Sequence, residues 1–348
     1  MILAGGTGTR LWPLARETRP KQFLKIIGGR SLFDRTMSRA RSLVGPGRII
    51  IVGGVGHRLF LRAQAKGIDS GQIILEGIGR NTAASIALAA LRIRAGHGDG
   101  VMIVFPSDHW IDSKTKFRAV IRSAVTRARR TDGLYIIGVP PRSADSGFGY
   151  VLPAERGNDG QFRRVAAFVE KPPPGVAARM VRSGRYLWNS GIFVWRASAI
   201  LDQLKRHRPG VVRAAATWAG KAGRGLWTVP TRVMRRMESV PIDRAVLERS
   251  RSTWVRRADF GWSDLGNWAA LADLLGGARR GNASLGPHRF IDSSGCLAVG
   301  GEGPIVMLGV KDLIAVRDGG TLLVCHRDAV QKVREVAEQM AGRDEGPR

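Results

Sequence analysis

Short apolar runs alternate with helical patterns over the first two-thirds of the chain, and this alternation is the feature that most constrains the fold. The apolar runs that predict strands are residues 48–52, 73–75, 101–105 and 134–138. Helices are predicted between them, at residues 31–43, 81–95 (with Asn81 as N-cap) and 115–130. Strands that alternate with helices favour an α/β fold, in which helices cover both faces of a mostly parallel sheet. Ligands of such folds bind beyond the carboxyl ends of the strands, so the polar residues there are of most interest.

The sequence pattern changes at about Asn282. Four short apolar runs follow one another with Gly/Asp turns and no helical pattern between them, and a helical pattern at residues 328–340 ends the region. This pattern predicts a small all-β unit with a terminal helix. We therefore expect two domains, a larger one at residues 1–278 and a small β domain at residues 282–342.

Composition excludes several classes of protein. No apolar run approaches the roughly 20 residues that a membrane-spanning helix needs, and the N-terminus lacks the pattern of a signal peptide. Two cysteines, Cys296 and Cys325, stand 29 residues apart without metal-ligand spacing. We therefore expect a cytoplasmic protein with neither a disulfide framework nor structural zinc.

The net charge of +28 comes mainly from 46 arginines, against 10 lysines. Such a charge suits an anionic partner, such as nucleic acid or a phosphorylated substrate. The arginines are scattered along the whole chain, however, so a compositional bias on a solvated surface is the preferred interpretation.

A glycine-rich turn opens the sequence. A short strand runs into it, and the residues of interest are Leu3, Ala4, Gly5, Gly6, Thr7, Gly8, Thr9 and Arg10, followed by Lys21. Glycines let backbone N–H groups approach an anion, and the two basic side chains can neutralise phosphate oxygens. The turn is neither a Walker A loop nor a dinucleotide fingerprint. Taken alone, Gly-Gly-Thr-Gly is equally consistent with a tight turn that binds nothing.

The longer string GGTGTRLWPL, followed by PKQFL, resembles the signature of the sugar-nucleotide pyrophosphorylases and is most similar to that of the mannose-1-phosphate guanylyltransferases. Further motifs that look like those of the family follow in order: GRNTA (79–83), PSDH (106–109), SGFGY (146–150), FVEKP (168–172), WNSGIF (188–193) and GWSDLGNW (261–268). The resemblance covers nearly the whole chain. It implies a Rossmann-like nucleotidyltransferase domain followed by a small β-helix-like domain.

The resemblance also implies roles for individual residues. It implies catalytic roles for Arg10, Lys21, Asp108, Lys171 and Asp264. Nucleotide binding is implied for Leu3, Ala4, Gly5, Gly6, Thr7, Gly8, Thr9, Arg10, Lys21, Asn81, Thr82, Pro106, Ser107 and Asp108. Sugar-phosphate binding is implied for Gly149, Glu170, Lys171, Asn189 and Asp264. Asp108 and Asp264 take the family's metal positions, whereas a structural role is expected for His109.

The implied reaction is the attack of a sugar 1-phosphate oxygen on the α-phosphorus of a nucleoside triphosphate. Both reactants are anionic, so the site must neutralise charge and fix geometry. A hard dication held by carboxylates serves this purpose, which implies Mg²⁺ as cofactor. The resemblance implies GTP and mannose 1-phosphate as substrates and GDP-mannose as product.

Three alternatives remain open. The chain could use another sugar 1-phosphate, such as a glucose or heptose phosphate, with a different base. It could be a basic nucleic-acid-binding protein, although no recognised binding motif is present. It could also be a catalytically silent regulatory homologue, which the intact charged residues argue against. We expect no nucleic-acid or membrane partner, and a homodimer is one option for the oligomeric state.

Three departures from the family pattern stand out. Met1 lies so close to Ile2 and Leu3 that the first strand is short, Asp318-Gly319-Gly320 replaces the usual turn, and Arg244 stands where the family typically carries tyrosine. Longer relatives carry an additional isomerase domain. Because the chain ends at Arg348, we expect no isomerase activity.

Overall fold

The computed structural model describes residues 1–6, 8–219, 227–276 and 281–341. The chain folds into two compact units. The larger unit comprises Met1–Gly5, Thr36–Ser107 and Ile111–Trp262. The smaller unit comprises Gly6–Arg35, Asp108–Trp110 and Ser263–Arg348. The first residues of the glycine-rich turn therefore belong to the larger unit, and the rest of the turn belongs to the smaller one.

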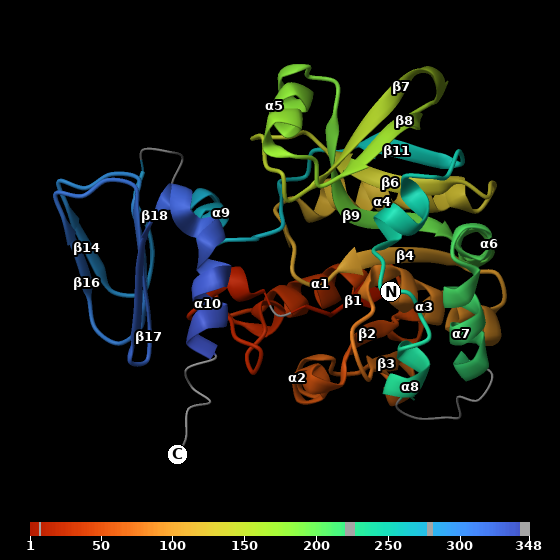
Figure 1. Cartoon of the computed structure of the whole chain (residues 1–348), viewed down its shortest axis with the longest axis horizontal. Helices are drawn as coiled ribbons and strands as arrows, with labels where there is room; N and C mark the ends of the chain where they lie inside the picture. Colours follow the sequence, from red (N-terminus) through yellow and green to blue (C-terminus); the bar gives the residue numbers. More distant parts are fainter. Residues whose placement is uncertain (7, 220–226, 277–280, 342–348) are drawn as a thin grey trace. The chain divides into compact units, whose positions relative to one another are not determined.

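A ten-stranded mixed sheet forms the centre of the larger unit, in the order β10-β3-β2-β1-β4-β9-β6-β11-β8-β7 (Figure 1). The strands are β1 (Ile2–Leu3), β2 (Ile51–Gly54), β3 (Ile73–Glu76), β4 (Val101–Pro106), β6 (Leu134–Val139), β7 (Gly149–Asp159), β8 (Phe162–Glu170), β9 (Leu187–Arg196), β10 (Trp227–Val229) and β11 (Thr253–Arg257). The run from β10 to β4 is parallel, and β9 is antiparallel to both β4 and β6. This arrangement confirms the predicted α/β fold with a mixed sheet.

Helices cover both faces of this sheet. The helices of the larger unit are α2 (Arg58–Gln64), α3 (Asn81–His97), α4 (Lys114–Ala128), α5 (Pro174–Arg182), α6 (Ala197–His207), α7 (Pro209–Ala219) and α8 (Thr231–Met234). Met102 and Val104 of β4 join the apolar core that contains α3, α6 and α7. Phe105, from the opposite face of β4, packs on Phe117 of α4 at a ring distance of 5.6 Å. The alternation along β4 therefore places α4 on the face opposite α3, as period-2 side chains require.

Short helical segments connect these elements. They are the 3-10 turns η3 (Pro46–Arg48), η4 (Val55–His57) and η5 (Ser70–Gln72), and the π-helix η6 (Asp243–Leu247). Two short strands, β5 (Trp110–Ile111) and β12 (Trp262–Ser263), form a separate two-stranded sheet at positions where the chain passes from one unit to the other. Helix α1 (Leu32–Arg41) also crosses the division between the units.

Two local predictions need correction. The strand predicted at 48–52 begins at Ile51, because the preceding Pro46–Arg48 segment forms a 3-10 turn with proline at its first position. Asn81 is not the N-cap that the sequence predicts. Its side-chain amide donates to Ser239 Oγ at 2.9 Å instead of accepting from the first turn, and the preceding Arg80 occupies the cap position without a side-chain hydrogen bond.

The smaller unit contains two facing sheets formed by its last segment, in the blue part of Figure 1. One sheet has the order β13-β15-β17-β18, and the other pairs β14 with β16. The bounds are β13 (Ala283–Leu285), β14 (His288–Ile291), β15 (Leu297–Val299), β16 (Ile305–Leu308), β17 (Leu313–Asp318) and β18 (Thr321–His326). All pairs except β17–β18 are parallel, and Cys296, Ala298, Ile305, Met307 and Ala315 form a small core. This arrangement confirms the small β-helix-like fold.

A second core of the smaller unit joins its early and late segments. Leu11 and Leu32 pack in one apolar cluster with Trp268, Leu297 and Val333. The helices of this unit are η1 (Thr9–Leu11), η2 (Lys21–Phe23), α9 (Trp268–Leu274), η7 (Arg327–Lys332) and α10 (Val333–Ala341). The helix predicted at 328–340 is thus a 3-10 segment that continues into α10. Because these early and late residues share one core, much of the glycine-rich segment is held by residues more than 240 positions away in sequence.

Candidate active site

The glycine-rich turn adopts a backbone that only glycine accepts easily. Gly6 and Gly8 have φ values of +80° and +67°, which side chains with a Cβ rarely adopt. A Cβ on Gly8 would also overlap the Cβ of Lys21, so this glycine lets the lysine stem lie against the turn. Gln22 Nε2 donates to the Gly6 carbonyl at 3.0 Å and fixes the turn from the same segment. Gly8 therefore determines both the path of the backbone and the position of Lys21.

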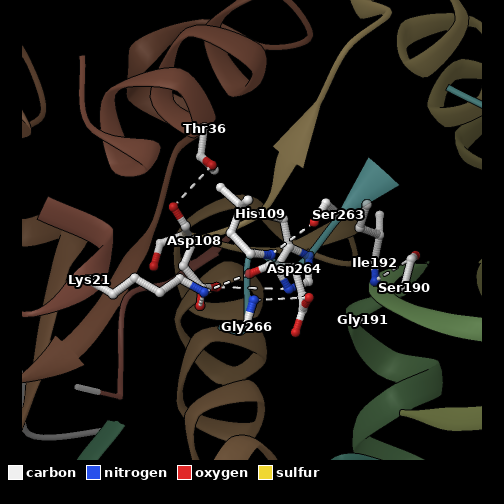
Figure 2. A network of polar contacts seen from close by, with 12 residues as sticks. Lys21, Thr36, Asp108, His109, Ser190, Gly191, Ile192, Ser263, Asp264 and Gly266 are labelled. Atoms are coloured by element: carbon white, nitrogen blue, oxygen red, sulfur yellow. Dashed lines mark hydrogen bonds and ion pairs between the residues drawn. The ribbon is translucent and has the colours of Figure 1, made fainter. Parts of the chain in front are cut away.

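Lys21 is the centre of a charged cluster in the smaller unit (Figure 2). Its ammonium lies 2.8 Å from Asp108 Oδ2 and donates to the backbone carbonyl of Asp264 at 2.6 Å. The side chain is only 5% exposed, whereas that of Asp108 is 35% exposed. One ammonium thus brings together the two aspartates that the sequence places 156 residues apart.

The charge of Asp108 is stabilised by its neighbours. Burial alone would raise the pKa of this carboxyl, but the charges of Lys21 and His109 and the hydrogen bond from Lys21 hold the pKa below its usual value. His109 Nε2 lies 3.8 Å from Asp108 Oδ1, beyond hydrogen-bonding distance. Asp108 is therefore ionised at neutral pH, as a metal ligand must be.

A strained turn presents Asp264. Leu265 is buried and has a φ of +47°, a conformation that costs a non-glycine residue on the order of 1 to 3 kcal/mol. The Asp264 carboxylate accepts a hydrogen bond from the Gly266 N–H at 3.1 Å. A Cβ on Gly266 would overlap this carboxylate. The residues that follow Asp264 therefore fix its orientation.

The donor set suits a hard divalent cation. Asp108 and Asp264 offer carboxylate oxygens, which Mg²⁺ prefers, and this ion commonly takes one or two carboxylates and completes its shell with water and substrate phosphates. Among the described residues, no group of three or more histidine, cysteine or acidic side chains could hold a metal without such help. The residues therefore fit a metal that binds together with a phosphorylated substrate.

A second polar cluster lies in the larger unit, around the end of β8. Glu170 and Lys171 belong to the FVEKP motif, and Lys171 Nζ lies 3.7 Å from Glu170 Oε1. Glu170 is 10% exposed and Lys171 is 59% exposed, so the lysine extends into solvent. Gly149 pairs with Glu170 across β7 and β8, and a Cβ on Gly149 would come within 2.6 Å of Glu170 Oε2. This glycine therefore makes room for the Glu170 carboxylate.

Asn189 on β9 is held at both ends of its amide. Its Nδ2 donates to Asp243 Oδ1 at 2.7 Å, and its Oδ1 accepts from the Gly191 N–H at 3.1 Å. The backbone N–H of Glu170 in turn donates to Glu248 Oε1 at 3.0 Å. Asp243 and Glu248 are thus functional candidates that the motif comparison missed, because only Arg244 drew attention to their segment.

The acidic groups of this cluster have raised pKa values. Burial raises the pKa of Glu170 to about 7, and the neighbouring Asp243 carboxylate contributes to the rise. Burial likewise raises the pKa of Asp243 to about 6, while the hydrogen bond from Asn189 and the charge of Lys171 oppose the rise. Carboxyls that titrate near neutral pH in a polar cluster are typical of functional sites.

The other residues implied to bind nucleotide follow strands or begin a helix. Ala4 leaves β1 and its carbonyl contacts His57 Nδ1 at 3.1 Å, and the Ser107 N–H donates to the Leu3 carbonyl at 2.9 Å. Thr82 Oγ1, at the start of α3, accepts from the Ile242 N–H at 2.8 Å. The α3 start is therefore connected to the segment that leads into η6.

The two units divide the predicted site residues between them. The smaller unit holds Gly6, Gly8, Thr9, Arg10, Lys21, Asp108 and Asp264. The larger unit holds Leu3, Ala4, Gly5, Asn81, Thr82, Pro106, Ser107, Gly149, Glu170, Lys171 and Asn189. Thr7 lies outside the described residues. In each unit, the predicted site residues thus lie at strand ends and tight turns, where parallel α/β folds bind ligands.

Within the smaller unit, the glycine-rich turn, the buried lysine and the two aspartates form a cluster suited to phosphate groups and a divalent cation. Residues 1–278 match the nucleotidyl transferase family, and residues 286–340 match the "MannoseP isomerase/GMP-like beta-helix domain". The chain belongs to the nucleotidyl transferase family.

Comparison with curated relatives and a solved structure indicates the type of nucleotidyltransferase. The chain is 36% identical to the xanthan biosynthesis protein XanB of Xanthomonas campestris pv. campestris over 99% of its length and 74% of the relative's. It is 34% identical to a mannose-1-phosphate guanylyltransferase of Escherichia coli over 97% of its length and 73% of the relative's. A "mannose-1-phosphate geranyltransferase" from Thermus thermophilus matches its structure with a TM-score of 0.89 and 30% identity, over 98% of each chain.

These similarities identify a nucleotidyltransferase of the sugar-phosphate type, whose family substrates are a nucleoside triphosphate and a sugar phosphate and whose family generally uses divalent metal ions. They confirm the resemblance seen in the sequence. Across the described part of the chain, none of the helices has both the length and the apolar character that a bilayer span requires.

Proposed function

We propose that this chain joins GTP and α-D-mannose 1-phosphate to give GDP-mannose and pyrophosphate, with Mg²⁺ as cofactor. The named E. coli relative and the order of the motifs support this choice of substrates. The observation that carries the chemistry is the cluster in which Lys21 contacts both Asp108 and the Asp264 turn. We further propose a catalytic domain at residues 1–278 and a small β domain at 282–342.

In the proposed reaction, an oxygen of the sugar 1-phosphate forms a bond to the α-phosphorus while the bond to the β-phosphate oxygen breaks. Pyrophosphate leaves with that electron pair, so no covalent enzyme intermediate is needed. Both reactants are negatively charged, and two unit charges 4 Å apart repel by about 4 kcal/mol at an effective dielectric of 20. The site must therefore supply positive charge and hold the two reactants in line.

Residues of the glycine-rich turn bind the triphosphate. The N–H groups around Gly5, Gly6 and Gly8 donate to phosphate oxygens, and Arg10 adds a charged fork suited to the same group. Lys21 provides a fixed point charge, because its side chain is buried and its ammonium is already oriented by Asp108. Asn81, Thr82, Pro106 and Ser107 border the nucleoside part.

Asp108 and Asp264 hold the metal ion. When bound, Mg²⁺ supplies charge that offsets the negative charge developing on the phosphate oxygens. Asp108 remains ionised because Lys21 lowers its pKa, and Asp264 is kept in place by the Gly266 N–H. The two residues would thus offer carboxylate oxygens to the metal, one beside the Lys21 ammonium and one in the turn whose backbone carbonyl accepts from Lys21.

Residues of the larger unit bind the sugar phosphate. Lys171 pairs with the phosphate, since its ammonium is exposed and already next to an acidic group. Glu170 and Asn189 contact sugar hydroxyls, for which carboxylate and amide groups offer both acceptors and donors. Gly149 keeps the Glu170 carboxylate accessible.

The test is pyrophosphate release by the purified chain over a grid of sugar 1-phosphates and nucleoside triphosphates, with and without Mg²⁺. We expect the rate to peak for mannose 1-phosphate with GTP and to require the metal. Asp108→Asn and Asp264→Asn should each lower kcat/KM by about a hundredfold or more, because metal stabilisation is worth several kcal/mol. Asp202→Asn is the matched control, since Asp202 is 66% exposed and pairs with the nearby Lys205 on the same helix.

Each result distinguishes between the alternatives. A maximal rate with another pair of substrates would support the same type of reaction but would refute the assignment of GTP and mannose 1-phosphate. Unchanged activity in Asp108→Asn or Asp264→Asn would refute the proposed metal site. A folded chain that is silent over the whole grid would refute the enzymatic proposal.

A further inference from the structure

A π-helix lies next to the sugar-phosphate cluster of the larger unit. Its five residues form η6 (Asp243–Leu247), and the Glu248 N–H donates to the Asp243 carbonyl at 2.9 Å, which closes one wide turn. Single π turns are rare and frequently occur at functional sites. A π turn is closed by a hydrogen bond between residues five apart in sequence. Asp243 and Glu248 therefore lie on the same side of this turn.

Asp243 fixes the orientation of the Asn189 amide. The 2.7 Å hydrogen bond from Asn189 Nδ2 to Asp243 Oδ1 allows only one assignment of the amide, since a carboxylate only accepts. The Gly191 N–H, which donates to Asn189 Oδ1, supports the same assignment. One N–H and one lone pair of Asn189 then remain for a ligand.

Glu248 acts on the neighbouring strand. Its Oε1 accepts the backbone N–H of Glu170 at 3.0 Å, at the position where β8 ends and Lys171 takes a φ of +51°. Asp243, the first residue of η6, and Glu248, directly after its end, therefore each hold one of the two motifs proposed to bind the sugar phosphate.

The same groups form one electrostatic cluster. Asp243 is faced by Asn189, Lys171 and Glu248, and Glu170 is faced by Asp243, Lys171, Glu248 and Arg244. Three carboxyls against two cations would repel a sugar phosphate if all three were ionised. Burial raises the pKa of both Glu170 and Asp243, which reduces the negative charge of this cluster as the pH falls below neutral.

We propose that Asp243 and Glu248, at the two ends of the π turn, are positioning residues for the sugar phosphate: Asp243 holds the Asn189 side chain and Glu248 holds the Glu170 backbone. This inference rests on the proposed roles of Asn189 and Glu170 in sugar-phosphate binding. It assigns a function to a segment outside the motifs that support the family resemblance.

The kinetic test compares Asp243→Leu, which removes the acceptor, with Asp243→Asn, which retains an acceptor oxygen. The pair Asp202→Leu and Asp202→Asn, on the adjacent helix α6, serves as control. We expect Asp243→Leu to raise KM for the sugar 1-phosphate about tenfold, the size expected for one charge-assisted hydrogen bond. KM for the nucleoside triphosphate should change less than twofold, and Asp243→Asn should remain within about threefold of the parent. Glu248→Leu should show the same selective effect, and Glu248→Gln should restore the parent value.

These measurements use whichever substrate pair is best in the grid, so a change of substrate does not affect the comparison. Equal increases in both KM values, or a loss of kcat and melting temperature alone, would overturn the positioning role.

A second readout does not require activity. The chain has five asparagines, so selective ¹⁵N labelling gives few side-chain amide signals. The Asn189 amide, identified by its loss in Asn189→Ala, should shift with pH around a midpoint near 6 in the parent chain and should not do so in Asp243→Asn. An Asn189 amide signal that keeps its parent position in Asp243→Leu would overturn the proposal, even for a chain that proves inactive, because the acceptor would then make no difference to the amide.

Discussion

In a chain produced with Met1 as its first residue, removing the charge from the Met1 amine should stabilise the fold, and the gain should increase as the pH falls. The amine donates to the Ile103 carbonyl at 2.8 Å, and Met1 is 8% exposed. Burial lowers the pKa of this amine from 8.0 to about 5. The unfolded chain therefore binds a proton below pH 8, whereas the folded chain binds it only below about pH 5.

The magnitude follows from this difference in pKa. Each unit corresponds to 1.36 kcal/mol, so a shift of about three units makes the folded state about 4 kcal/mol less stable below pH 5 than with an uncharged amine. At pH 7, one unit below the unfolded value, the cost is about 1.4 kcal/mol, and above pH 8 it vanishes. The free energy of unfolding is therefore unaffected by this amine above pH 8, and it decreases as the pH falls from 8 to 5.

The perturbation is N-terminal acetylation, which removes the charge and keeps the N–H that contacts Ile103. A cavity of about 920 Å³ borders Met1, Ile50 and Met102, and we expect it to accept the acetyl group. Melting temperatures of the acetylated and free chains should agree within about 1 °C at pH 9. They should differ by about 3 to 6 °C at pH 7 and by more at pH 5.5, at 2 to 4 °C per kcal/mol.

The comparison isolates one group, because every other titrating side chain is present in both chains and cancels in the difference. Mass spectrometry confirms that only the terminal amine is modified. A difference in melting temperature that is the same at pH 5.5, 7 and 9 would show an ordinary pKa for the amine and would refute the reasoning.

Two further predictions concern single side chains. Gly8→Ala should lower kcat/KM at least tenfold in the pyrophosphate assay, because it combines a φ of +67° with a Cβ that overlaps Lys21. The control is Gly54→Ala, whose Cβ would have nothing within 4 Å and which should leave kcat/KM nearly unchanged. Burial raises the pKa of Glu76 to about 7, so wild-type stability should fall as the pH rises from 4.5 to 7. Glu76→Gln should remove most of this loss, about 3 kcal/mol, and a pH-independent difference in melting temperature would contradict it.

The sequence predicts those parts of the structure that depend on local patterns. The apolar run at Val101–Pro106 becomes β4, and the Ala/Leu/Ile run after Asn81 becomes the buried helix α3. Motifs with fixed spacing also predict Asp108 and Asp264 as one pair, and the structure connects them through Lys21. These features can be predicted because each depends on residues that are close in sequence or on a family signature.

Long-range packing could not be predicted in this way. Nothing in residues 6–35 indicates that Leu11 and Leu32 share a core with Val333, since an apolar side chain does not specify a distant partner. For the same reason, the sequence does not predict that the chain passes from the larger unit to the smaller one after Gly5, within the glycine-rich turn. That position depends on which of the two cores each neighbouring side chain packs into.

Asp243 and Glu248 show a different limit of sequence analysis. Residues five apart on an α-helix point about 140° away from each other, so the spacing predicts two unrelated acids. Only the wider π turn brings both onto one side, where the first meets Asn189 and the second meets the Glu170 backbone. The rare geometry of this turn, and not the residue types, makes the pair a candidate for positioning the sugar phosphate.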